Sequence, residues 1–169
     1  ALLGGVALAE ALSAFLPDSA AIRLKWPNDL LLGGAKLAGM LCEGAAHAGR
    51  IEWIVLGLGA NLAVAPEVPD RPTTCLGAHA PAPDPEAAAV ALIRSVDAWR
   101  QRVAVDGIGP LLDAWQRRGP QPGARLTLRT AAGETSGLYR GLDTDDALLL
   151  ETDGRTRRFA TGELSGGGD

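Results

Sequence analysis

Residues 25–43 read KWPNDLLLGGAKLAGMLCE, and this stretch predicts how the surrounding part of the chain folds. Residues 30–32 form a short apolar run, and Gly33 and Gly34 follow it. A Gly-Gly pair favours a tight turn between two strands because both residues accept positive φ. The chain is then expected to return as a strand over residues 36–43, so the stretch predicts a β-hairpin.

Neighbouring segments extend this hairpin into a larger sheet. Residues 22–24 alternate in polarity ahead of it, residues 48–50 favour a second turn, and residues 51–58 have the composition of a further strand. Two consecutive hairpins make an antiparallel meander. The segment GLGAN, residues 57–61, closes it.

Helices are predicted on both sides of this meander. Residues 6–16 carry apolar side chains at helical spacing and are apolar almost all round, which predicts a buried helix within a larger body. Asp84 is expected to cap a helix that starts at Pro85, and a shorter helix is expected at about residues 110–118. Residues 65–84, which are rich in Pro and Ala, are expected to form a surface loop.

The pattern changes after residues 119–123, GPQPG, which have the composition of a linker. Short alternating stretches separated by turn residues follow, and they predict four short strands forming a small barrel or part of one. We therefore expect two domains, residues 1–119 and residues 120–169. The second domain is too small to bury a large core alone, so we expect it to pack against the first.

The composition excludes several classes of protein. The 169 residues are 47% hydrophobic and 21% charged, values that argue against wholesale disorder. A membrane-spanning helix is not expected, because the sequence has no run of about 18 apolar residues. The net charge of −4 disfavours nonspecific nucleic-acid binding, which requires a basic surface.

The cysteine and histidine content is low. Cys42, Cys75 and two histidines are too few for a zinc site of ordinary spacing or a disulfide framework, so no metal site is predicted. A reduced, cytoplasmic protein is the default expectation. The sequence opens on the apolar segment 1–16 without Met, which predicts a cut inside a domain or a truncation. A processed or mis-started gene is the alternative.

Residues that could carry chemistry gather around the first hairpin. Asn28 and Asp29 follow a proline, where they either form an Asx turn or face a cleft. Lys36, beside the tight turn, is either a solubilising surface lysine or a fixed cation. Glycines inside strands, such as Gly39 and Gly57, often mark the close approach of a ligand. Together these features suit a flat ligand lying against backbone, with a cation near its anionic end.

The strings KWPNDLLLGGAKLAGMLCE (residues 25–43) and GLGANLA (residues 57–63) closely resemble the motifs of the biotin–protein ligase family. The segments GLD (141–143) and ALLLETDG (147–154) resemble the family's C-terminal portion. The resemblance implies an α+β fold with a mixed or antiparallel sheet and helices, N-terminally incomplete here and followed by a small SH3-like β-barrel. Related folds occur in class II aminoacyl-tRNA synthetases and lipoate ligases. The two expected domains are then a partial catalytic domain and an SH3-like domain.

The same resemblance implies an activity and its participants. Enzymes of this family use ATP and Mg²⁺ to activate biotin as biotinyl-5′-AMP, and they transfer the biotin to a lysine of a biotin carboxyl carrier protein domain. It implies a cytoplasmic protein with no membrane partner and no nucleic-acid partner for this chain. A homodimer is compatible with it. A DNA-binding helix-turn-helix would have to lie outside these residues.

The family's motifs also imply roles for individual residues. Lys36 matches a lysine that contacts the biotin carboxylate and the α-phosphate, and Asp29 matches an acid that orients Lys36, the substrate lysine or Mg²⁺. These two are the expected catalytic residues. The expected biotin-binding residues are Lys36, Gly39, Leu41, Gly57 and Gly59. The expected ATP- or adenylate-binding residues are Asn28, Lys36 and Asn61.

The sequence departs from the family pattern in two respects. Ala60 stands where Ile or Val is usual, and residues 1–169 contain no counterpart of the family's glycine- and arginine-rich GRGRRG-type loop, which binds biotin and phosphate. These residues alone are therefore expected to be inactive. One alternative is a lipoate–protein ligase, which the KWPND and KLAG motifs disfavour. Another is a non-catalytic module for dimerisation or carrier binding.

Overall fold

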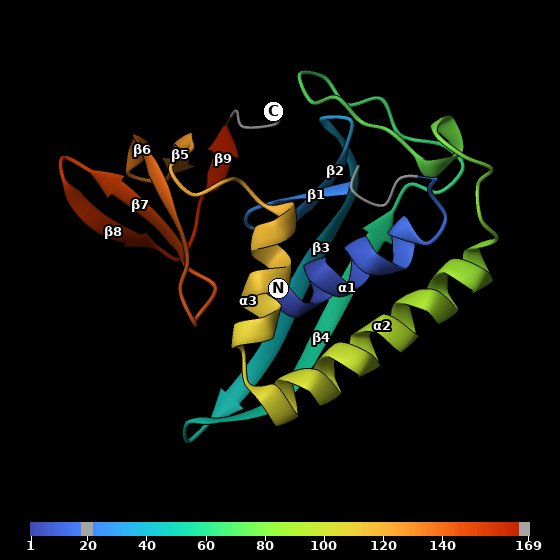
Figure 1. The fold of residues 1–169 in the computed structure, drawn as a ribbon, viewed down its shortest axis with the longest axis horizontal. Coiled ribbons are helices and arrows are strands. Elements are labelled where there is room, and N and C mark those ends of the chain that lie inside the picture. Colours follow the sequence, from blue (N-terminus) through green and yellow to red (C-terminus); the bar gives the residue numbers. More distant parts are fainter. Residues whose placement is uncertain (18–21, 166–169) are drawn as a thin grey trace.

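The computed structural model describes residues 1–17 and 22–165, and this part of the chain forms two antiparallel sheets and three α-helices (Figure 1). The α+β class expected from the sequence is confirmed. Within these residues, none of the helices combines the length and the apolar character that crossing a membrane requires.

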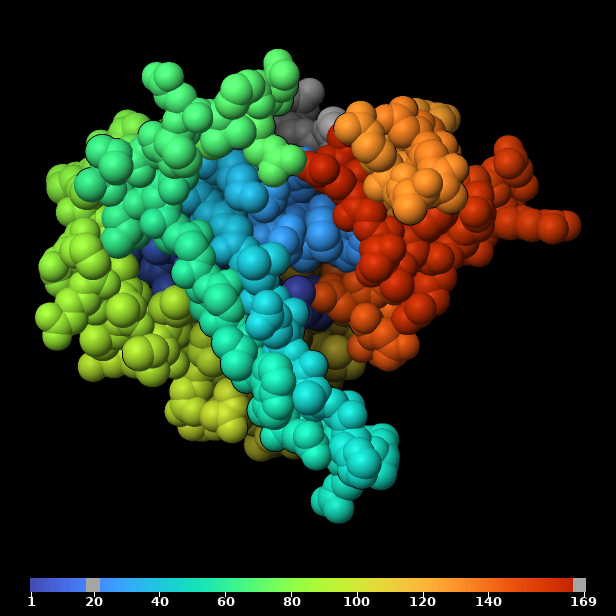
Figure 2. Space-filling model, turned by 180° about the vertical axis from the view of Figure 1, so that it is seen from behind, coloured from blue at the N-terminus to red at the C-terminus, as the bar shows by residue number. Residues whose placement is uncertain are grey.

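The first sheet has the strand order β1-β2-β3-β4 and confirms the predicted meander. Its strands are β1 (Ile22–Lys25), β2 (Asp29–Leu32), β3 (Ala35–His47) and β4 (Arg50–Ala60). The last two are longer than expected, because they stay paired almost to the tight turn that joins them. Figure 2 shows the tip of this hairpin projecting beyond the rest of the molecule.

Helices α1 (Leu2–Ser13), α2 (Pro85–Asp106) and α3 (Gly109–Arg118) cover one face of this sheet (Figure 1). The core between helices and sheet consists mainly of Leu, Ala, Val, Ile and Trp side chains. Asp84 caps α2 as expected, since the N–H of Ala87 donates to its Oδ2 at 3.1 Å.

Helix α1 is buried along most of its length, as its apolar character predicts. It begins earlier than expected because Gly4 and Gly5 pack closely against Met40, a contact that outweighs the low helix propensity of glycine. It ends at Ser13, earlier than expected, where the chain tightens: the N–H groups of Phe15 and Leu16 donate to the carbonyls three residues back, both at 3.1 Å.

The second sheet has the strand order β8-β7-β6-β5-β9. Its strands are β5 (Arg125–Thr130), β6 (Gly133–Leu142), β7 (Leu148–Thr152), β8 (Arg155–Phe159) and β9 (Glu163–Ser165). The sequence predicts only four of these strands. Strand β9 is too short to show alternation, and it forms because it pairs with the free edge of β5.

The segment between β4 and α2 is more firmly held than a surface loop. It contains the short 3-10 helix η2 (Leu76–Ala78), whose Leu76 is fully buried. The thiol of Cys75 donates to the carbonyl of Ala63 at 3.2 Å. These contacts hold the middle of the segment against the end of the first sheet.

The two sheets are joined by direct contacts. The indole N–H of Trp26 donates to the backbone carbonyl of Asp146 at 2.9 Å. The hydroxyl of Tyr139 donates to Oε1 of Gln116 on α3 at 3.1 Å, and its ring lies 6.3 Å from that of Trp115. Burial raises the pKa of the Tyr139 phenol. The second sheet therefore packs against α3 and the start of the first sheet.

The turn between β6 and β7 is organised by one carboxylate. Oδ1 of Asp143 accepts the backbone N–H groups of Ala147 and Asp145, both at 2.9 Å, and its Oδ2 pairs with Arg158. The bond from Ala147, followed by the Arg158 contact, lowers the pKa of Asp143. Asp143 is therefore more readily ionised in the folded chain than in the unfolded chain.

We expect Asp143→Asn to reduce the acid sensitivity of the fold. Stabilisation by ionised Asp143 is present above the unfolded-state pKa of about 3.9 and is lost as the pH falls through the lower folded-state pKa. The variant should unfold at a lower temperature than the wild type at pH 7, and the difference should shrink at pH 3. Thermal unfolding at the two pH values tests this. Asp153→Asn, in the neighbouring β7–β8 turn, is the control, and an equal response from both variants would contradict the assignment.

Candidate functional site

An extra residue in β3 places Lys36. Leu30 pairs with Ala38 but Leu31 pairs with Lys36, so Leu37 is additional on the β3 side. Leu37 and Ala38 are consecutive and both buried, which regular strand alternation does not allow. Such a bulge shifts the alternation by one residue. Lys36 is thereby turned away from the core.

The ammonium group of Lys36 forms an ion pair with Asp29. Asp29 opens β2 and is largely buried. A buried carboxylate is costly unless it is paired, so Lys36 supplies the charge that Asp29 needs in this position. The pair also restricts where the ammonium can point.

Gly39 leaves the space that this ion pair occupies. Asp29 on β2, Gly39 on β3 and Gly59 on β4 face one another across the sheet. A Cβ atom on Gly39 would lie 3.1 Å from Nζ of Lys36 and 3.3 Å from Oδ1 of Asp29. The absence of a side chain at position 39 therefore serves the ion pair itself.

The same face of β3 and β4 is open beyond Gly39. A Cβ on Gly59 would meet nothing within 4 Å, and one on Gly57 would meet only Leu41, at 3.9 Å or more. Leu41 pairs with Gly57 and is 69% exposed. The residues expected to bind biotin thus share one exposed face whose floor is largely backbone. The structure brings these residues together but does not test their roles.

The two asparagines hold backbone segments in place. The side-chain N–H of Asn28 donates to the carbonyl of Met40 at 2.7 Å, and the backbone N–H of Met40 returns to the Asn28 carbonyl at 3.0 Å. The side chain of Asn61 donates to the carbonyl of Thr74 at 2.9 Å. Both amides therefore have a structural task, and the side-chain Oδ1 of each accepts no hydrogen bond from the described residues, so it could accept one from a ligand.

Two cavities adjoin Lys36, and the larger of them has a mainly polar lining. The larger, about 260 Å³, lies between the first sheet and the start of β9 and is lined by Lys25, Trp26, Pro27, Asn28, Asp29, Lys36, Arg71, Gly162 and Glu163. The smaller, about 180 Å³, is lined by Lys36, Leu37, Ala38, Gly39, Asn61, Pro66, Val68, Arg71 and Thr73. Lys36 and Arg71 are common to both cavities. Arg71 and Glu163 were missed in the sequence, because neither belongs to a motif with recognisable spacing.

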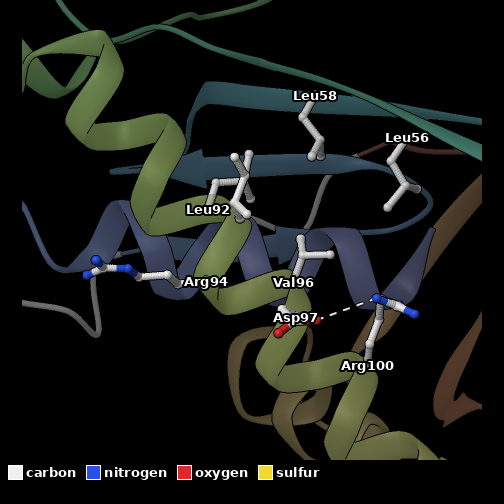
Figure 3. A pocket seen from close by; sticks show the side chains of 8 residues that line it. Leu56, Leu58, Leu92, Arg94, Val96, Asp97 and Arg100 are labelled. Atoms are coloured by element: carbon white, nitrogen blue, oxygen red, sulfur yellow. Dashed lines mark hydrogen bonds and ion pairs between the residues drawn. The ribbon is translucent and has the colours of Figure 1, made fainter.

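A third cavity, of about 420 Å³, lies on the other side of the sheet (Figure 3). It is an apolar groove between Leu56 and Leu58 of β4 and Leu92 and Val96 of α2. Its charged groups lie at its margin on α2, where Asp97 pairs with Arg100 at 3.5 Å. The groove shares no residue with the two cavities beside Lys36.

Comparison with known proteins gives a consistent answer. The model of the Biotin/lipoate A/B protein ligase family matches residues 1–61. The biotin–[acetyl-CoA-carboxylase] ligase of Paracoccus denitrificans is 31% identical over 88% of this chain and 64% of its own length. The bifunctional ligase/repressor BirA of Escherichia coli K12 is 34% identical over 97% of this chain and 51% of its own length. In all of these comparisons this chain is similar to biotin–protein ligases.

The fold of this family is also found in structural comparison. The biotin protein ligase of Aquifex aeolicus, solved in complex with biotin and ATP, superposes with a TM-score of 0.75 over 97% of this chain and 68% of that one, at 21% identity. Its apo structure gives a TM-score of 0.77 at 20% identity. At this identity the likeness concerns the fold alone. The chain spans between about half and two thirds of the length of the curated ligases named above.

The two strand glycines should differ in their tolerance of a side chain. We expect Gly39→Val to lower the free energy of unfolding by about 1–3 kcal/mol, because its side chain displaces Lys36 from Asp29. Gly59→Val is the matched control and should stay within about 0.5 kcal/mol of the wild type, since its Cβ enters open space. Urea unfolding of the three proteins measures this. Equal losses for the two variants would show that Gly39 has no special steric role.

Proposed function

We propose that the protein to which this chain belongs is a biotin–protein ligase. In the first step a carboxylate oxygen of biotin attacks the α-phosphorus of ATP, the bond to the β-phosphate breaks, and pyrophosphate leaves with biotinyl-5′-AMP remaining. In the second step a lysine amine of a carrier domain attacks the acyl carbon, loses a proton and displaces AMP. The observation that carries the proposal is the Lys36 ammonium, which is held by Asp29 and lines two adjoining cavities.

The positive charge of Lys36 offsets the negative charge that opposes the first step. Biotin and ATP are both anions, so they repel each other as they approach, and negative charge builds up around phosphorus in the transition state. An ammonium already fixed by Asp29 needs little reorganisation to offset that charge. In this proposal Asp29 acts as a positioning residue, and Lys36 touches the reacting groups.

The glycine-lined face of β3 and β4 suits the biotin ring system. A flat ligand can approach the backbone at Gly57 and Gly59 because no Cβ stands in the way, and the exposed side chain of Leu41 lies beside Gly57 as an apolar contact. In this arrangement the carboxylate end of the ligand points toward Gly39 and Lys36. The relatives' names and the Aquifex complex with biotin and ATP support this choice of ligands.

ATP is assigned to the side of Lys36 that Asn61 lines. Asn61 and Lys36 border the smaller cavity and Asn28 borders the larger, so these residues surround the position proposed for the reacting phosphate. Mg²⁺ enters with the nucleotide, because this ion usually binds ATP-using enzymes through substrate phosphates and only one or two carboxylates. The proposed partner is a biotin carboxyl carrier domain, and a homodimer stays a prediction.

A lipoate–protein ligase is the second candidate, because the matching family model includes lipoate ligases. Pyrophosphate release by the full-length protein, measured with biotin and with lipoate at equal concentrations, separates the two candidates. Release with biotin alone is the expected result. Release with lipoate alone would reject the proposal in favour of the second candidate.

We expect Lys36→Gln in the full-length protein to lower the rate of adenylate formation by about 10²-fold or more, the scale of losing one preorganised electrostatic partner. Transfer from pre-made biotinyl-5′-AMP should be affected less, since phosphorus is not attacked in that step. Single-turnover measurements of the two steps test this. Arg129→Gln, which breaks an exposed ion pair on the second sheet, is the control and should leave both rates unchanged. Equal adenylation by the wild type and Lys36→Gln would reject the role of Lys36.

A further inference from the structure

Arg71 is the second cation that lines both cavities beside Lys36, and the backbone of the residues that follow it is hydrogen-bonded to Lys36. The N–H of Lys36 donates to the carbonyl of Pro72 at 2.8 Å, and the N–H of Thr74 donates to the carbonyl of Lys36 at 2.9 Å. Residues 72–74 therefore lie alongside the start of β3. Because Arg71 directly precedes them, its side chain remains near Lys36 although it belongs to a connecting segment.

The present partner of Arg71 is easily exchanged. Its Nη2 atom lies 2.6 Å from Oε1 of Glu163, the first residue of β9. The two side chains are 47% and 50% exposed, so solvent screens the attraction and the ion pair is worth little. Another anion that reaches the guanidinium with better geometry can replace the Glu163 carboxylate.

The charges around the larger cavity favour such an anion. Lys25, Lys36 and Arg71 line it, against the carboxylates of Asp29 and Glu163. Lys36 is held by the largely buried Asp29, whereas the exposed Glu163 is the one carboxylate among the described residues that pairs with Arg71. A guanidinium presents parallel N–H groups that match two oxygens of a phosphate, and it binds phosphate more selectively than an ammonium does.

We propose that Arg71 is a phosphate-binding residue of the nucleotide site. Without nucleotide its guanidinium pairs with Glu163, and with nucleotide it exchanges that carboxylate for phosphate oxygens on the side of the anion opposite Lys36. This inference rests on the proposed ligase function and adds a residue to its ATP site. The competing explanation is that Arg71 only fastens the connecting segment to the second sheet through Glu163.

Two substitutions that break the same ion pair separate these explanations. In the full-length protein, Arg71→Ala should raise the KM for ATP about tenfold, the loss of roughly one hydrogen bond to a charged group, with the KM for biotin unchanged. The KM for ATP of Arg71→Lys should lie between those of the wild type and Arg71→Ala, because lysine keeps the charge but lacks the planar guanidinium group. Glu163→Gln should leave the KM for ATP unchanged or lower it, because it removes a competitor for the guanidinium.

The measurement is biotin-dependent exchange of pyrophosphate into ATP, with melting temperatures of all variants as a check on folding. Arg140→Ala is the matched control, because it breaks another arginine–glutamate pair, with Glu151, on the second sheet. If Arg71→Ala and Glu163→Gln raise the KM for ATP equally, Arg71 only holds the connecting segment against the second sheet, and the inference is overturned. An unchanged KM in Arg71→Ala also overturns it.

The failure of the underlying proposal gives a different result. If the wild-type protein shows no biotin-dependent exchange, the ligase function fails and the role of Arg71 fails with it. If the wild type is active and loses adenylation in Lys36→Gln but not in Arg71→Ala, the ligase function stands and only the Arg71 inference is rejected. Should Arg71→Ala melt at a lower temperature than the control, Arg71→Gln, which preserves more of the side chain, replaces it in the same comparison.

Discussion

The arrangement around Lys36 depends on the single extra residue in β3. Leu37 and Ala38 both need burial, and a regular strand would send one of them to the open face. The bulge satisfies both and turns Lys36 toward Asp29, so the apolar core and the ion pair are consequences of the same backbone irregularity. Without it, regular alternation would direct the Lys36 side chain to the buried side of the sheet.

The residues of the site come from parts of the chain that are distant in sequence. Asp29 and Gly39 come from the hairpin, Asn61 directly follows β4, and Arg71 comes from the segment between β4 and α2. Glu163 comes from the second sheet, 92 residues from its partner Arg71. The larger polar cavity is thus bordered by both sheets, and the packing of the second sheet on the first helps to shape it.

The sequence predicts those features whose signal is local. The Gly-Gly turn, the meander and the Asp84 cap are encoded within a few neighbouring residues and are confirmed. The bulge is not predictable in this way, because LAG inside an apolar strand looks the same with or without it. Strand β9 and the Arg71–Glu163 pair arise from tertiary contacts and leave no periodicity. The roles of the site residues and the domain boundary near residue 120 remain predictions.

The placement of the tryptophans gives the protein its own optical probes. Trp26 is buried, borders the larger polar cavity and hydrogen-bonds to the second sheet, so its fluorescence is sensitive both to events in that cavity and to separation of the sheets. Trp99 and Trp115 are buried in the helical layer, and Trp53 on the projecting hairpin is 49% exposed. An aqueous quencher such as iodide reaches Trp53 first, which leaves emission from the buried indoles. Ligand binding and sheet separation can therefore be followed by fluorescence without attaching a label.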